Sequence, residues 1–530
     1  MNSQRARTTN PWLVLLVLCL GFFMILLDTT IVYVATPSML TNLHASLDAV
    51  LWVFNGYLLA YAVLLITSGR LGDLFGPKRM FLAGLALFTA ASAACGLSND
   101  ANTLIAARVA QGVGGALLSP QPMAFITSLF AAQRRGAAFG VFGGVIGLAT
   151  ALGPTLGGLI VTYANWRWIF FINVPVGLLA LLATGLLVPD LRPGRRHRLD
   201  LVGVALASGA LLAIVYALIE GQRYDWGVVS GVVTIPGILV AGALLVVAFF
   251  VWESRQAEPL VPLRLFRDRD FSAGNGIGAA MAFGMQAVFI PLTIYTQSVL
   301  GMSPLVSGLT FLPMSLVSMF AAPLAGRVTD RFGGRRVLMA GLLLFGGGSL
   351  WASRIASTGS NLWTFLPAML VMGVGLGMTF APLTTVAMRR IQPQVAGAAS
   401  SVLNTTRQVG GAIGAAMVGA VLQNRLAVHL DEQARLAASG LPAQARQSFI
   451  AGFAQAGKNG LHVGVGQAGG VHLPAALQAL VTQVFDNAYL AAMRPTIVVG
   501  VVVLLLGAAA ALMLERGSAA SDAEEVRLAA

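Results

Sequence analysis

The stretch "GRLGDLFGPKR", residues 69–79, has a second copy in the chain, "GRVTDRFGGRR" at 326–336. Each copy directly follows a long apolar run, and the two copies are 257 residues apart. Their glycines permit a tight turn and a close approach of helices. Internal repeats of this kind are typical of secondary transporters, whose substrate site lies between the two halves near the membrane midplane. The repeat therefore predicts a membrane protein built from two related halves.

The composition also indicates a membrane protein. Of the 530 residues, 57% are hydrophobic and 10% are charged, whereas soluble domains carry about 25% charged residues. Many runs reach the roughly 20 apolar residues that cross a bilayer as a helix. They lack the alternation of barrel strands, so we expect an all-α polytopic protein. The fourteen candidate spans lie at about 11–36, 48–68, 80–98, 102–129, 137–162, 166–189, 201–220, 229–252, 271–299, 305–326, 337–353, 361–388, 395–423 and 494–514.

The basic residues are distributed unevenly between the predicted loops. If the N-terminus is cytoplasmic, the segments on that side hold 23 Lys and Arg, and the short loops on the opposite side hold 3. This excess is the positive-inside pattern, and it puts both termini in the cytoplasm. Attraction to the anionic inner leaflet then accounts for the net charge of +13, so we expect no nucleic-acid partner.

The repeat predicts the domain organisation as well. Its first copy follows the second span and its second copy follows the tenth, so the halves are displaced by eight spans rather than six. We expect an N-terminal six-helix bundle at 1–200, two additional spans at 201–254 and a C-terminal six-helix bundle at 255–530. The long polar segment 424–493 is expected to be an extracellular loop, which is either mobile or folded into a short helix or hairpin.

Two ionisable residues stand inside apolar runs. Asp28 lies in "GFFMILLDTTIVYVATP" at 21–37, and Arg108 lies in "LIAARVAQGVGGA" at 104–116. Ionisable residues at membrane depth are costly, and they mark proton or substrate pathways. Their predicted depths are similar, and a functional role is expected for both. The alternatives are a carboxylate that only pairs helices and an arginine that only binds backbone carbonyls.

The repeated stretch resembles the G-x-L-x-D-x-x-G-x-[RK]-[RK] loop of the major facilitator superfamily. This resemblance implies a major facilitator fold, in which the loop is a conformational latch and its aspartate faces the end of a helix from the other half. Pro77 stands where the family usually has a basic residue, and Val328 stands for a leucine. The latch residues implied by the resemblance are Gly69, Asp73, Gly76, Arg79, Gly326, Asp330 and Gly333.

Two further segments resemble motifs of the same superfamily. Arg108 and Gln111 match its R-x-x-Q-G motif, which implies that the arginine takes part in proton transfer. The segment "GLATALGPTLGG", 147–158, resembles the G-x-x-x-G-P-x-x-G-G motif of exporters, although Ala149 replaces its first glycine. A kink needed only for packing is the alternative. The matching residues are Gly153, Pro154, Gly157 and Gly158.

The segments "NWRWIFFINVPVG", 165–177, and "NTTRQVGGAIGAA", 404–416, resemble one branch of the superfamily. It is the fourteen-span drug:proton antiporter branch, which includes the EmrB and QacA multidrug exporters. The resemblance implies efflux of small amphiphilic compounds or drugs, with protonation of Asp28 coupled to alternating access. With a single deep carboxylate, we expect neutral, monocationic or zwitterionic substrates. The residues expected to line the substrate cavity are Tyr33, Tyr57, Gln111, Gln286, Phe289 and Arg407.

Other functions remain open at this point. One alternative is a dedicated exporter of a single metabolite or antibiotic, and others are an importer, a membrane-embedded enzyme and a scaffold or receptor. We expect no enzyme and no catalytic residues, because no histidine lies in a predicted span. No phosphate-binding loop is found, so the proton gradient is the expected energy source, without a cofactor or a metal. We expect a monomer in the lipid bilayer of a bacterial cytoplasmic membrane, with small molecules and protons as its partners.

Overall fold

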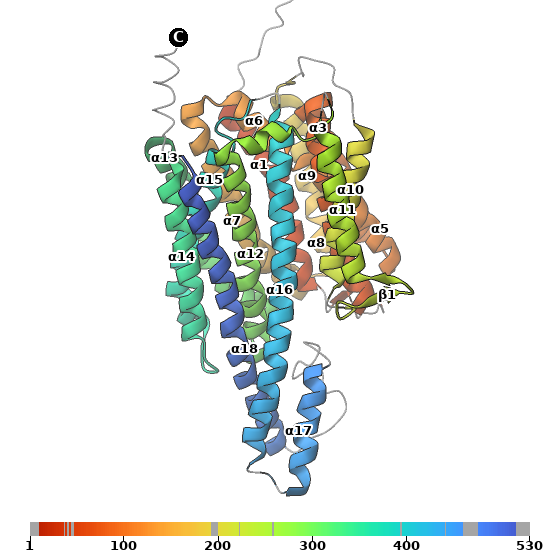
Figure 1. Ribbon diagram of the computed structural model, residues 1–530, viewed down its shortest axis with the longest axis vertical. Helices are drawn as coiled ribbons and strands as arrows, with labels where there is room; N and C mark the ends of the chain where they lie inside the picture. The colour runs from red at the N-terminus through yellow and green to blue at the C-terminus, as the bar shows by residue number, and fades with distance from the viewer. Residues whose placement is uncertain are drawn as a thin grey trace, which may run out of the picture.

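The structure is a computed structural model, which describes residues 10–35, 38–39, 42–43, 47–191, 200–221, 223–256, 259–392, 395–439, 441, 443–458 and 475–515. Most of these residues are helical, and the long helices run side by side along the long axis of the molecule (Figure 1). The all-α fold predicted from the apolar runs is therefore confirmed.

In the first part of the chain, up to residue 187, helices α1 and α5 each begin at a residue whose side chain caps the helix. The side chain of Asn10 accepts from the backbone N–H of Trp12, and that of Asp100 accepts from the backbone N–H of Thr103. The elements are α1 (Pro11–Ile31), η1 (Val32–Ala35), α3 (Leu47–Phe75), α4 (Pro77–Leu97), α5 (Ala101–Leu118), α6 (Gln121–Leu129), α7 (Ala132–Tyr163), α8 (Trp168–Phe171) and α9 (Asn173–Leu187).

A pair of helices and a short hairpin follow, and then a second series of helices. The elements from residue 201 onward are α10 (Leu201–Glu220), β1 (Val228–Ser230), β2 (Val233–Thr234), α11 (Ile235–Glu253), η2 (Leu263–Arg267), α12 (Arg269–Ile294), η3 (Tyr295–Val299), α13 (Pro304–Phe332), α14 (Gly334–Ile355), η4 (Leu362–Phe365), α15 (Leu366–Ala387), α16 (Ala396–Ala438), α17 (Ala443–Lys458), α18 (Ala475–Ala510) and η8 (Ala511–Met513). Strands β1 and β2 pair antiparallel.

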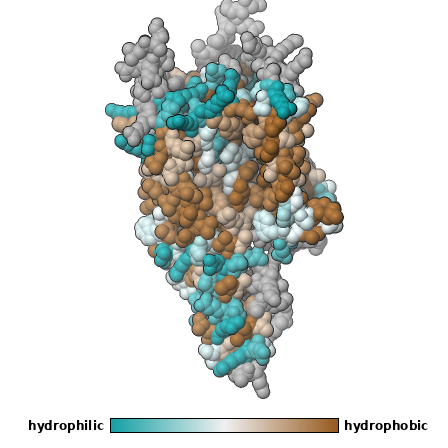
Figure 2. All heavy atoms as spheres, viewed as in Figure 1, coloured by the Kyte–Doolittle hydropathy of each residue, from teal (hydrophilic) through white to brown (hydrophobic). Residues whose placement is uncertain are grey.

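The surface has the pattern of a membrane protein. Figure 2 shows hydrophobic residues across the middle of the molecule and hydrophilic residues gathered toward both ends. Within the described residues, twelve helices are long and apolar enough to cross a membrane. The predicted spans at 102–129 and 137–162 correspond to α5 with α6 and to α7, which are not among the twelve. The count of fourteen therefore stays a prediction, and a break at 119–120 divides the first of these two segments.

The sequence repeat is also a structural repeat. The turns from α3 to α4 and from α13 to α14 each contain a glycine in the left-handed region, Gly76 with φ 94° and Gly333 with φ 82°. The following helices each cross a neighbour closely through a glycine: Gly84 of α4 meets α5, and Gly341 of α14 meets α15. Because only glycine adopts such φ values and such close approaches readily, the same residue type recurs in both halves.

The two halves meet along long helices. Helix α13 packs along α7, α15 also contacts α7, and α16 packs along α3. The two additional helices lie at the side of this assembly, since α10 packs on α3 and α11 packs mainly on α10. Helix α11 accordingly leaves large apolar residues exposed, including Val240, Leu244 and Val247. Such a face suits contact with lipid.

The described part of 424–493 is largely helical, whereas its polar composition predicted a loop that is either mobile or folded into a short helix or hairpin. Helix α16 has 43 residues, so it is about 65 Å long, roughly twice the 30 Å bilayer core. It continues because Leu422, Leu426 and Leu430 recur every four residues and are buried. They belong to one apolar cluster with residues of α18, and α17 packs alongside α16. Figure 1 shows these three helices projecting from one end of the molecule.

Candidate functional site

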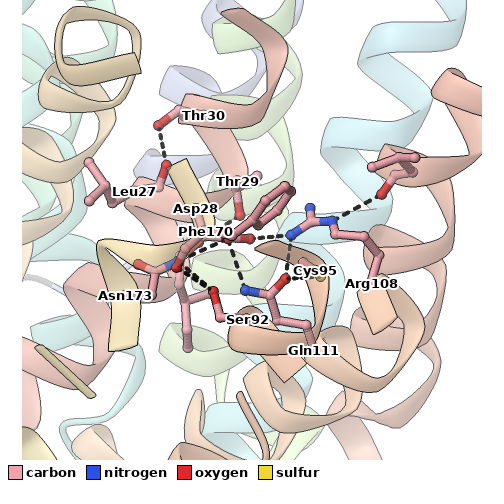
Figure 3. A network of polar contacts seen from close by, with 12 residues as sticks. Leu27, Asp28, Thr29, Thr30, Ser92, Cys95, Arg108, Gln111, Phe170 and Asn173 are labelled. Atoms are coloured by element: carbon pink, nitrogen blue, oxygen red, sulfur yellow. Dashed lines mark hydrogen bonds and ion pairs between the residues drawn. The ribbon is translucent and has the colours of Figure 1, made fainter. Parts of the chain in front are cut away.

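Asp28 is the centre of a buried polar network. It lies near the end of α1 and is 0% exposed. Its Oδ2 accepts from Arg108 Nη1 at 2.5 Å, and its Oδ1 accepts from Gln111 Nε2 at 2.9 Å. Asn173 Nδ2 donates to the same Oδ1 at 3.2 Å (Figure 3). A carboxylate with three donors is well supported in its ionised form, even without water.

Arg108 completes a neutral ion pair with Asp28. Its side chain is 1% exposed, and Nη1 also donates to Gln111 Oε1 at 2.7 Å. Its Nε donates to the carbonyl of Val53 on α3 at 3.0 Å, and its Cζ lies 4.2 Å from the centre of the Tyr57 ring. A buried ion pair offsets its desolvation cost only when such additional bonds are present. Removing one partner would leave an uncompensated charge.

Four helices bring the network together. Asp28 comes from α1, Arg108 and Gln111 come from α5, and Asn173 is the first residue of α9. A support from α4 holds Asn173 in place, because Asn173 Nδ2 donates to Ser92 Oγ at 3.1 Å and Ser92 Oγ donates to the carbonyl of Phe170 at 2.9 Å. All of these helices belong to the first half of the chain.

Three residues of the network, Asn173, Ser92 and Cys95, were not predicted as site residues from the sequence. Cys95 Sγ donates to Gln111 Oε1 at 3.7 Å, which makes it an outer member of the network. The signal for Asn173 is an amide side chain inside the apolar stretch "IFFINVPVG". A polar side chain at that depth needs a partner, and the partner turns out to be Asp28.

The glycines at 153–158 let α7 approach its neighbours. A Cβ on Gly153 would overlap the Oγ1 of Thr30 and lie 2.6 Å from its Cβ, and Thr30 is two residues beyond Asp28. Gly158 faces the other half, where a Cβ would lie 3.1 Å from the Cα of Leu305 on α13. Gly157 is buried, and the side chain of Pro154 lies outside the described residues.

The first latch stretch touches the other half of the protein. Asp73 Oδ1 accepts from the backbone N–H of Gly397 at 3.2 Å, and Oδ2 accepts from that of Ala398 at 3.1 Å. These are the first orphan amides of α16, which a carboxylate satisfies well. Gly69 packs against Gly397 and Ser401. Gly76 forms the turn, and Arg79 is exposed.

The second latch stretch has the same turn but a different neighbour. Gly326 of α13 packs against the backbone of Gly136 at the start of α7, and Gly333 forms the turn into α14. The side chain of Asp330 lies outside the described residues. Both copies therefore place a glycine where the two halves touch.

The structure separates the predicted cavity residues into two groups. Tyr57 and Gln111 lie at Asp28, as described above. The others whose side chains are described lie in the second half: Gln286 is half-buried on α12, and Phe289 packs its ring 4.9 Å from that of Phe311. The Cζ of Arg407 lies 4.6 Å from the centre of the Phe380 ring. The side chain of Tyr33 lies outside the described residues.

No group of three or more His, Cys, Asp and Glu side chains in the described part of the chain is placed to hold a metal ion. Cys19 and Cys95 are free and buried.

Comparison with known proteins gives a consistent family. The family model described as Major Facilitator Superfamily matches residues 18–415. The tetracenomycin C resistance and export protein of Streptomyces glaucescens is 38% identical, covering 79% of this chain and 77% of that protein. The multidrug resistance protein Stp of Mycobacterium tuberculosis is 36% identical, covering 78% and 76%.

Among solved structures, the human organic anion transporter MFSD10 aligns with a TM-score of 0.60. It is 14% identical, and the alignment covers 93% of this chain and 99% of that one. At this level of identity the likeness concerns the fold alone.

Proposed function

This chain belongs to the major facilitator superfamily, and on that premise we propose that it exports small amphiphilic compounds or drugs across a bacterial cytoplasmic membrane in exchange for protons. The observation that carries this proposal is the fully buried pair of Asp28, on the candidate spanning helix α1, and Arg108, on α5. An intramembrane carboxylate with a single cationic partner is a group whose charge a proton can switch. The names of the two relatives support drug efflux.

In this mechanism the proton competes with Arg108 for the Asp28 carboxylate. When Asp28 is protonated, the ion pair is lost and Arg108 carries an uncompensated charge in a water-free site. Gln111 is placed to follow this change, because it donates to Asp28 and accepts from Arg108. A different arrangement of the hydrogen bonds among these side chains is then more stable than the one described here. Proton binding therefore biases the equilibrium between conformations of the protein. Entry of the proton along the membrane potential contributes about 2.3 kcal/mol per 100 mV.

The contact of Asp73 with the start of α16 supports a latch role for the first stretch. We propose that it holds the two halves together at their cytoplasmic ends in the conformation described here. Both termini are then cytoplasmic, and the projection formed by α16, α17 and α18 is extracellular. We also propose that the protein is a monomer and that the proton gradient drives it without a cofactor. Of its two six-helix bundles, the first ends at residue 200 and the second begins at residue 255, with the two additional helices between them.

A dedicated exporter of a single antibiotic is the second candidate. It is favoured by the relative named for tetracenomycin C resistance and export, which matches over most of both chains. A panel of unrelated compounds separates the two candidates. Export of several unrelated compounds indicates a multidrug exporter, and export of a single chemical series indicates a dedicated one.

The test is substrate-induced proton release from the purified protein in detergent, with neutral, monocationic and dicationic dyes as probes. Wild type is expected to release protons and Asp28→Asn is expected not to, since the amide cannot exchange the proton. Asp100→Asn is the matched control, because Asp100 is an exposed cap at the start of the helix that carries Arg108. Proton release by a folded Asp28→Asn protein equal to that of wild type would refute the role of Asp28.

A further inference from the structure

We propose that Arg407 binds an acidic group of the exported compound, a carboxylate or a phenolate attached to an aromatic ring. This inference rests on the proposed export function and specifies its substrates. It starts from a difference between two arginines of the helical bundle, Arg108 and Arg407. Arg108 is paired with a carboxylate, and Arg407 is not paired with any acid in the part of the chain that the structure describes.

In the part of the chain that the structure describes, the donors of Arg407 have no protein acceptors. Its Nε is buried without a hydrogen-bond partner, and the described residues make no hydrogen bond or ion pair with its guanidinium. Its contact is the face of the Phe380 ring, 4.6 Å from Cζ. Arginine has five donors and stays protonated in proteins, so a charge with its hydrogen bonds unmade is costly at this depth. A ligand that supplies acceptors would remove that cost.

The position of Arg407 is where a transported molecule would pass. It stands 11 residues after the first residue of α16, about 16 Å along the helix, which is near the middle of a roughly 30 Å bilayer core. Helix α16 belongs to the second half and packs along α3 of the first half. Tyr61 of α3 is close enough to interact electrostatically with Arg407. The arginine therefore faces the boundary between the halves, where transporters of this architecture bind substrate.

The surroundings select a flat acidic molecule. The stem of Arg407 lies against Gly278 of α12, where a Cβ would come within 3.2 Å of Arg407 Cγ, so only a glycine leaves it full room. Phe380 offers an aromatic surface beside the guanidinium. The planar guanidinium forms two parallel hydrogen bonds with a carboxylate. An anion also leaves the cell along the inside-negative potential, in the direction that favours export.

The inference narrows the substrates expected from the sequence. The single deep carboxylate pointed to neutral, monocationic or zwitterionic compounds. With Asp28 neutralised by Arg108, the positive charge of the half-buried Arg407 has no acid beside it in the described residues. Compounds with an acidic group, zwitterions included, fit this balance, and purely cationic compounds do not.

The test uses a fluorescent aromatic carboxylate and its neutral methyl ester, measured for binding to the purified protein and for export from vesicles. Wild type is expected to bind the acid more tightly than the ester. Arg407→Gln should weaken binding of the acid by at least about tenfold, the usual effect of losing a hydrogen bond to a charged group, and should leave the ester nearly unchanged. Arg407→Lys should retain part of the preference.

The control variant is Arg425→Gln, which removes an exposed arginine from the same helix. A further readout separates ligand binding from a structural role. If Arg407 binds a ligand, Arg407→Gln should be at least as stable to heat as ligand-free wild type. The aromatic carboxylate probe should then raise the melting temperature of wild type and not that of the variant. A structural arginine would instead give a less stable variant with both probes weakened equally.

The outcomes distinguish this inference from the proposed function. Failure of wild type to export either probe or any compound of the dye panel would refute efflux. Export of both probes with an unchanged acid preference in Arg407→Gln would refute the inference and leave efflux standing. Failure of wild type to prefer the acid would also overturn it.

Discussion

The carboxylate of Asp73 accepts the backbone N–H of Gly397, a residue 324 positions later in the chain. Its second oxygen accepts the N–H of Ala398. A side chain of α3 thus performs the capping of α16, which lies in the other half of the protein. The start of α16 is satisfied only while the halves are in contact at this end, so a change in their separation exposes these amides.

Asp73→Ala is expected to loosen the start of α16. The loss of a helix cap costs about 1 kcal/mol, which corresponds to about fivefold faster hydrogen–deuterium exchange in a peptide that covers 396–405. The matched control is Asp268→Ala, which removes the cap of α12, where Asp268 Oδ1 accepts from Asp270 and Phe271 within one half. That control should affect α12 alone. Unchanged exchange at the start of α16 in Asp73→Ala would contradict the latch.

Gly69→Ala is expected to keep the two halves from closing at the same end. A Cβ at Gly69 would overlap Ser401 Oγ and the carbonyl of Gly397, and overpacking of this kind costs about 1–3 kcal/mol. Export rates should fall at least about fivefold, as measured in vesicles. Adding Ser401→Ala should not restore export, because the Gly397 carbonyl still blocks the Cβ. Gly185→Ala, at an open position on α9, is the control, and a normal rate in Gly69→Ala would reject the close contact.

A pH-dependent contribution to stability is expected from Glu515. Its carboxylate pairs with Arg390 at 2.5 Å, and this hydrogen bond holds the pKa of Glu515 below its usual value. A lowered folded-state pKa means that the contribution is present at neutral pH and is lost as the pH falls through that pKa. Both side chains are largely exposed, so the contribution is about 0.5 kcal/mol. The melting temperatures of wild type and Glu515→Gln should differ at pH 7 and low salt, and they should become equal in acid. A difference in melting temperature that persists in acid would show that the substitution acts through packing and not through the ion pair.

Much of the fold follows directly from the sequence, because a spanning helix must be apolar and must satisfy its own backbone. The latch repeat also predicted the two glycine turns, since the required φ values exclude most other residues. The extension of α16 was missed for a physical reason. Its polar residues cover three sides of the helix outside the membrane, and its buried side is marked only by a leucine every fourth residue from Leu422 to Leu430.

The charged residues of the candidate site could be predicted from the sequence. Asp28 and Arg108 stand out because a charged residue in an apolar run is costly, and their contact at 2.5 Å agrees with their similar predicted depths. Asn173 carries no charge and lies 145 residues from Asp28 in the chain. Only the packing of α9 against α1 and α4 brings it to the carboxylate. The absence of an acid beside Arg407 in the described residues likewise depends on tertiary structure.

Asn173→Ala is expected to slow proton-coupled export by about tenfold at pH 7, because one of three donors to the ionised Asp28 is lost and such a bond is worth about 1.5–3 kcal/mol. Raising the pH should restore export, because a lower proton concentration favours the ionised carboxylate. Asn173→Asp should slow export more strongly, and raising the pH should not restore its export rate, since two carboxylates about 3 Å apart cannot both ionise.

The measurement is the export rate in vesicles from pH 6 to pH 9. Ser128→Ala is the control, because Ser128 in the described structure donates a hydrogen bond to Ala124 within α6. A pH profile of Asn173→Ala that superimposes on that of wild type would show that Asn173 positions α9 without acting on Asp28.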